Sequence, residues 1–127
     1  MKSYLLLIYL PRDTEIKTKA KKFFLKKGYY VYVGSMKIGI KRVIRHFKKN
    51  KKKHWHIDFL LEKAQPIFAI LLDLEEKELS KLMENYGKPI EGFGNTDLDT
   101  KSNLFFLPSN EIALDKQSIY ITIDKIG

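Results

Sequence analysis

Apolar positions in the first third of the chain follow the spacing of strands. Tyr4–Leu10 is a continuous apolar run closed by Pro11, and Tyr29–Val33 is a run of aromatic and β-branched residues. Both patterns predict buried strands. Glu15–Lys19 alternates weakly and is expected to be a short edge strand. The N-terminal region is therefore expected to form an antiparallel hairpin or meander.

The spacing changes after Gly34-Ser35, which ends the second strand. From Lys37 to Lys49 the apolar residues recur as they do on one face of a helix. The residues expected to face inward are Ile40, Val43, Ile44 and Phe47. The outer faces then carry basic side chains, namely Lys41, Arg42, Arg45, Lys48 and Lys49.

The rest of the chain mixes both spacings. His54–Leu61 fits either a strand or the start of a helix. The other predictions, in chain order, are a strand at Ile67–Leu72, a helix at Glu75–Tyr86 with Leu79, Leu82 and Met83 inward, a loop at Gly92–Lys101, and strands at Leu104–Leu107 and Ile119–Ile123. Together these elements predict one α+β domain over residues 1–127, with a small, mostly antiparallel sheet flanked by helices.

Charge is unevenly distributed along the chain. Residues 12–53 hold 16 Lys/Arg and two acidic residues, a local net charge of +14, whereas the remainder holds 8 basic and 13 acidic residues, a net of −5. Lysine runs are commonly only a solvated surface. Sixteen cations interleaved with aromatic strands exceed what solubility needs, and we interpret the stretch as a surface for a polyanion, most simply a nucleic acid.

Cysteine is absent, which excludes disulfides, thiol catalysis and zinc–thiolate sites. The apolar run Tyr4–Leu10 is too short to span a membrane. We therefore expect a cytoplasmic protein without a membrane partner.

Three side chains with complementary chemistry lie within or shortly after the predicted strand Tyr29–Val33. Tyr32 lies near its end, Arg42 comes eight residues after Gly34, and His46 comes four residues after Arg42, on the same helical face. An arginine neutralises a phosphate, and a phenol or an imidazole transfers protons. The alternative is that Tyr32 is a plain strand residue and Arg42 a surface residue of the helix.

These residues resemble part of a known motif. Tyr32-Val33-Gly34, followed by Arg42 and His46, is similar to the second half of the GIY-YIG nuclease motif. Tyr4 stands where the first half would be, without the first glycine, and Glu76 stands where that superfamily carries a metal-binding glutamate.

A closer resemblance is to a GIY-YIG-like family of unknown function, which occurs alone or fused to endonuclease III-type glycosylases. It covers roughly the first 107 residues, and the segments that carry it are Gly28–Ser35, Arg45-His46, His54–Leu60, Phe93–Asp97 and Ser102–Phe105. The chain departs from this family where the family has two cysteines and a histidine, since Leu98, Thr100 and Asn103 stand there. A Cys/His metal site in that loop is therefore excluded.

The resemblance implies a GIY-YIG-like fold and metal-dependent phosphodiester hydrolysis. Glu76 would bind Mg²⁺ or Mn²⁺, Tyr4 or Tyr32 would activate or orient water, Arg42 would contact the phosphate, and His46 would lie beside it. We expect the lysine-rich surroundings to lower the pKa of the tyrosine that acts as a base. Favourable electrostatics at a helix start is the alternative role of Glu76.

Two further groups of residues are candidates. The predicted nucleic-acid contacts are Lys37, Lys41, Arg45, Lys48 and Lys49. A second tier consists of Ser35, His54, His56 and Asp58. His-x-His-x-Asp would form a metal site on a strand, but we favour hydrogen bonding within a packed junction beneath Trp55. Asp97 is expected to be a turn or cap residue.

Three functions are consistent with these patterns. The first is a nuclease-like domain acting on DNA, or on structured RNA. The second is a non-catalytic nucleic-acid-binding module, and the third is a partner-binding domain for a repair glycosylase. Whether the domain is an enzyme stays open at this point.

Overall fold

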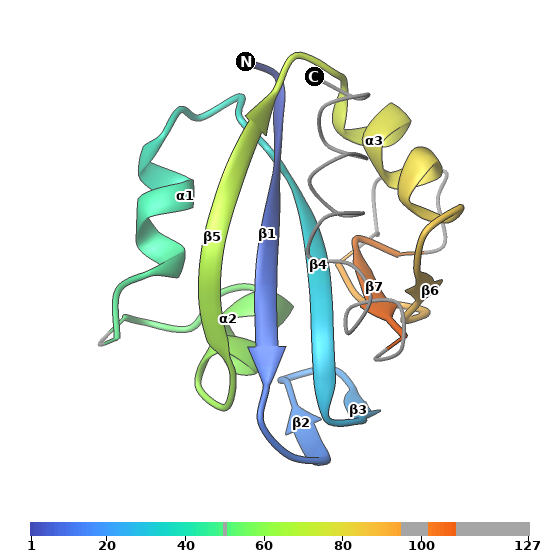
Figure 1. The fold of residues 1–127 in the computed structure, drawn as a ribbon. Coiled ribbons are helices and arrows are strands. Elements are labelled where there is room, and N and C mark those ends of the chain that lie inside the picture. The colour runs from blue at the N-terminus through green and yellow to red at the C-terminus, as the bar shows by residue number, and fades with distance from the viewer. Residues whose placement is uncertain (50, 95–101, 109–127) are drawn as a thin grey trace.

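The protein is built on a five-stranded antiparallel sheet (Figure 1). The structure, a computed structural model, describes residues 1–49, 51–94 and 102–108. The strands, in their order across the sheet, are β5 (Gln65–Leu72), β1 (Ser3–Leu10), β4 (Gly28–Ser35), β7 (Leu104–Leu107) and β6 (Lys88–Pro89). The predicted α+β fold with a mostly antiparallel sheet is confirmed.

The N-terminal strands pair as expected, with an inserted hairpin between them. β1 pairs with β4 over its whole length, from Ser3 opposite Ser35 to Leu10 opposite Gly28. Between them, β2 (Thr14–Lys17) and β3 (Lys22–Leu25) form a separate two-stranded sheet. The sequence did not predict β3, because only four residues alternate there. Ile119–Ile123, Asp97 and most of the Gly92–Lys101 loop lie outside the described residues.

The first helix is shorter than the sequence predicted, and its buried face differs. Helix α1 spans Lys41–His46, not Lys37–Lys49, and of the four apolar residues expected inward only Val43 is buried. Ile44, for example, is half exposed, whereas His46 faces the interior. Two overlapping stripes on this segment satisfy helical spacing, and packing against the sheet selected the one that carries Val43 and His46.

The other two helices are also short. Helix α2 (His56–Leu61) resolves the ambiguous segment as a helix, with Ile57, Asp58 and Leu60 buried. Helix α3 (Glu76–Met83) is shorter than predicted, and Leu79 and Met83 are buried as expected while Leu82 is only half buried. Among the described residues, no helix is long and apolar enough to cross a membrane.

The sheet separates two apolar clusters, because successive side chains of a strand point to opposite faces. Tyr4, Leu6, Ile8 and Leu10 of β1 pack with residues of α1, α2 and the β2–β3 hairpin. Leu5 packs on the other face, in the cluster that contains the buried side chains of α3. Figure 1 shows α1 and α3 on opposite sides of β1. Most of the candidate site therefore lies on the α1 face of the sheet, and α3 adjoins it only through its first residues, at one end of the sheet.

Candidate active site

Three of the predicted catalytic side chains meet on the α1 face of the sheet. Tyr4 pairs with Gly34, and Tyr32 lies two residues before Gly34 on the same face of β4. The Tyr4 hydroxyl lies 2.6 Å from Nε2 of His46. The ring centroid of His46 is 5.6 Å from that of Tyr4 and 5.9 Å from that of Tyr32. All three side chains are buried.

Gly34 makes this packing possible. A Cβ atom built at Gly34 would lie 2.1 Å from Cζ of Tyr4. Real Cβ atoms essentially never approach so closely, so a larger residue would displace the phenol. The glycine is needed here because of a side chain on the neighbouring strand.

Arg42 and Glu76 bring opposite charges to the two phenols. Burial is the largest effect and raises the pKa of both Tyr4 and Tyr32. Arg42 opposes it through its charge and through hydrogen bonds to both phenols, while Glu76 raises the pKa of both further. The expectation that neighbouring lysines lower a tyrosine pKa is wrong, since burial dominates and Arg42 is the cation involved. Both phenols are protonated at neutral pH.

His46 is a neutral base at neutral pH. Burial, followed by the charges of Lys51 and Arg42, lowers its pKa to about 4, although Asp58 opposes the shift. A neutral imidazole has one acceptor nitrogen. The Tyr4 hydroxyl and Nε2 of His46 share a hydrogen bond of 2.6 Å, whose direction is set by the tautomer of the imidazole. Both partners of this bond are neutral at neutral pH, because burial raises the pKa of Tyr4 and lowers that of His46.

Asn103 is a site residue that sequence reasoning missed. Its Nδ2 donates to Oε1 of Glu76 at 3.1 Å and to the carbonyl of Val33 at 3.2 Å. Its Oδ1 is buried and has no hydrogen-bond partner among the described residues, and neither has Nε of Arg42. The available signal was that Asn103 replaces a histidine of the family that the chain resembles.

The donor set suits a hard cation with few protein ligands. No group of three or more His, Cys, Asp or Glu side chains that could hold a metal occurs among the described residues. Glu76 does provide a half-buried carboxylate, next to the unpartnered amide oxygen of Asn103. Mg²⁺ keeps several waters and commonly uses only one or two carboxylates. The residues therefore fit Mg²⁺, or Mn²⁺ bound in the same way.

Asp58 organises the segment beside the site. Its fully buried carboxylate accepts two hydrogen bonds from Arg45, at 2.7 and 2.9 Å. It also accepts the backbone N–H groups of His54 and Trp55, at 2.8 and 3.0 Å. Burial raises the pKa of Asp58, but these hydrogen bonds outweigh it and the net shift is downward. Arg45 is therefore held in a buried ion pair rather than presented freely to phosphate.

The His-x-His-x-Asp segment does not converge on one point. His54 is exposed and precedes α2, whereas the half-buried His56 ring lies 5.5 Å from both Phe23 and Phe93 between ring centroids. These contacts match the packed-junction alternative. Trp55 does not cover the junction, however, since it is 38% exposed and has the Arg42 and Arg45 guanidinium carbons 4.6 and 4.7 Å from its ring centroid.

The basic residues of this region divide into two sets. Of the predicted nucleic-acid contacts, four side chains are exposed, namely Lys37, Lys41, Lys48 and Lys49. Lys51 instead donates to the carbonyls of Arg45 and His46, which end α1, and Lys53 pairs with Glu62 at 2.9 Å. Lys51 is therefore tied to the end of α1, whereas Lys53 lies in an exposed ion pair. Ser35 accepts the backbone N–H of Lys37 at 3.1 Å, which stabilises the turn after β4.

Comparison with protein-family models gives a match over most of the chain. A family model described as a domain of unknown function, DUF123, matches residues 3–123. Neither the curated proteins nor the solved structures give a match.

Proposed function

The chain belongs to the DUF123 family of domains of unknown function, and we propose that it is a nuclease-like domain that hydrolyses phosphodiester bonds of DNA with a divalent metal ion. The observation that carries the proposal is the meeting of Tyr4, Tyr32, His46 and Arg42 in one cluster, with Glu76 beside it. These residues come from four elements. The resemblance to a GIY-YIG-like family that also occurs fused to endonuclease III-type glycosylases suggests a role in repair, next to a glycosylase partner.

In this proposal Arg42 contacts the phosphate, and Tyr4 and His46 act as a proton relay. The Tyr4 oxygen accepts a proton from the attacking water while its own proton moves to Nε2 of His46, 2.6 Å away. The negative charge of a bound phosphate would raise the pKa of His46 and strengthen it as the final acceptor. Tyr32 orients the same water or the phosphate, with its proton retained.

Glu76 and Asn103 would hold the metal ion. Asn103 already orients the carboxylate through its amide N–H, and its unpartnered Oδ1 would be the second protein ligand. A divalent ion bound there would stabilise charge on the leaving oxygen.

One observation favours a second candidate, a non-catalytic nucleic-acid-binding module. Tyr4, Tyr32 and His46 are each no more than 3% exposed. A phosphate would have to displace covering atoms to reach them. In that case the lysines bind nucleic acid and the buried cluster only stabilises the fold.

Nicking of supercoiled plasmid and of branched DNA, with Mg²⁺ or Mn²⁺, tests the proposal. Wild-type protein should nick, and both Arg42→Ala and Glu76→Gln should abolish nicking while circular dichroism shows an intact fold. Glu78→Gln, an exposed carboxylate on the same helix, is the matched control and should nick normally. Salt-sensitive binding without cleavage under either metal would leave the second candidate, and no binding at low salt would leave only the partner-binding role.

A further inference from the structure

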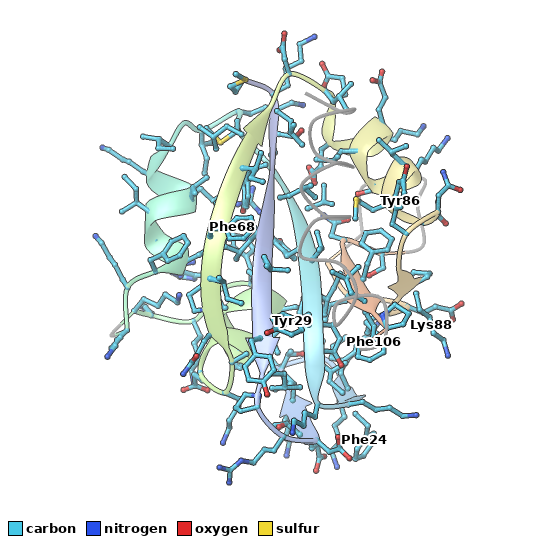
Figure 2. All side chains as sticks on the ribbon, in the orientation of Figure 1. Phe24, Tyr29, Phe68, Tyr86, Lys88 and Phe106 are labelled. Carbon is cyan, nitrogen blue, oxygen red and sulfur yellow. The ribbon has the colours of Figure 1, made fainter. Side chains whose placement is uncertain are left out.

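The β2–β3 hairpin has one face that the fold does not use. On one face Ile16, Phe23 and Leu25 are buried in the core. On the other face Phe24 is 78% exposed and lies opposite Glu15. Figure 2 shows Phe24 at the lower end of the molecule, pointing away from the five-stranded sheet.

Charge on this face is also unfavourable for the isolated protein. Lys17 lies directly opposite Lys22, and like charges in this arrangement destabilise a strand pair. The only acidic partner among the described contacts is Glu15, 3.6 Å from Lys22, and both of those side chains are about half exposed. Between residues 12 and 27 the chain has seven basic and two acidic residues. An anionic ligand would relieve this repulsion.

We propose that the β2–β3 hairpin is a second contact site for nucleic acid, where Phe24 stacks on the base of an unpaired nucleotide and Lys17 and Lys22 contact the flanking phosphates. The inference rests on the proposed nucleic-acid function and narrows its substrate to DNA with a single-stranded segment. Aromatic side chains within basic surfaces bind single strands in this way, since every base has a stacking face that a duplex hides.

The hairpin lies away from the candidate active site along β1. Tyr4 is near the start of this strand and Leu10 ends it next to the hairpin, so roughly 20 Å of strand, at about 3.3 Å per residue, separate Tyr4 from the start of the hairpin. The buried face of the hairpin reaches back toward Tyr32, since Phe23 packs on Phe93 and Phe93 packs on Tyr32. The separation along β1 corresponds to about six stacked nucleotides at 3.4 Å each. A substrate with a duplex or branch point near the active site and a single-stranded arm of that length would reach both.

Fluorescence anisotropy with a labelled 16-nucleotide single strand and the matching duplex tests the inference. Phe24→Ala should weaken single-strand binding about 5- to 100-fold and leave duplex binding unchanged. The control Tyr86→Ala removes another exposed aromatic residue, outside the basic stretch, and should change neither. Lys17→Ser with Lys22→Ser should weaken binding and reduce the salt dependence by about 0.7 per lost phosphate contact.

Two results would overturn the inference. One is wild-type affinity of Phe24→Ala for the single strand. The other is an effect of Phe24→Ala only on binding to phosphatidylserine vesicles, which would assign the hairpin to a membrane surface. Nicking by the wild type separates this inference from the proposed catalysis. If nicking occurs but Phe24→Ala binds normally, the hairpin inference fails alone. If Phe24→Ala loses single-strand binding but the wild type never nicks, the catalytic proposal fails alone.

Discussion

Acidification should destabilise this protein through one buried histidine. The unfolded chain protonates His46 with a pKa near 6.5, whereas the folded protein does so only near pH 4. Between these values the unfolded state binds more protons, so the free energy of unfolding falls as the pH falls. The stabilisation that neutral His46 contributes is fully present above pH 6.5, is lost progressively below it, and does not change further below about pH 4.

The size of the effect follows from the two pKa values. Between pH 7 and pH 5 the linkage relation gives a loss of roughly 2 kcal/mol, and near pH 5 the slope is about 1.2 kcal/mol per pH unit. For a domain whose total stability is on the order of 5–15 kcal/mol, that loss is easily measured. Carboxylates such as Asp58, whose pKa is lowered, make the free energy of unfolding depend on pH mainly below pH 4, which is outside the range from pH 7 to pH 5.

Urea denaturation at half-unit steps from pH 7 to pH 5 is the assay. His46→Gln removes the titrating group. The free energy of unfolding of this variant should therefore fall by roughly 2 kcal/mol less than that of the wild type between pH 7 and pH 5. His56→Gln is the comparison variant: burial and Lys21 also lower the pKa of His56, so this substitution should flatten the pH dependence too, but less than His46→Gln because the ring is only half buried. Parallel pH curves for wild type and His46→Gln, or an imidazole NMR midpoint for His46 near 6.5, would refute the reasoning.

Three substitutions test the packing around the site. Gly34→Ala should cost about 1–3 kcal/mol of stability in chemical denaturation, because the new methyl group would collide with the Tyr4 ring; wild-type stability would show that the ring moves freely. Asp58→Ala should cost about 3–5 kcal/mol, since it leaves Arg45 without its buried partner, and a loss under 1 kcal/mol would contradict that picture. Asn103→Leu should cost about 1–3 kcal/mol, measured the same way, because it removes both hydrogen bonds of the amide; an unchanged midpoint would show that these bonds contribute nothing.

The strands were predictable because their patterns are local. The runs Tyr4–Leu10 and Leu104–Leu107 form strands close to the expected bounds, since continuous apolar segments of this length can be buried in few other ways. Helix α1 was harder. Its six residues contain only two apolar side chains, Val43 and Ile44, and local spacing cannot choose whether the face with Val43 and His46 or the face with Ile44 turns inward.

The candidate site was predictable only as a set of residue types. Tyr32, Gly34, Arg42 and His46 stood out by spacing and by resemblance, and the structure brings them together with Tyr4. The roles of Arg45 and Asn103 did not follow from the sequence. Each depends on a partner distant in the chain, 13 residues away for Arg45 and 27 for Asn103.

The sequence by itself determined the α+β class, the main strands and the basic character of residues 12–53, because periodicity and charge are properties of neighbouring residues. Only the tertiary structure decided which charges are free and which groups titrate abnormally. Burial raises the pKa of Tyr4 and lowers that of His46, and burial is set by the packing of β1 against α1. Desolvation is therefore the physical reason why the chemistry of this site could not be obtained from spacing alone.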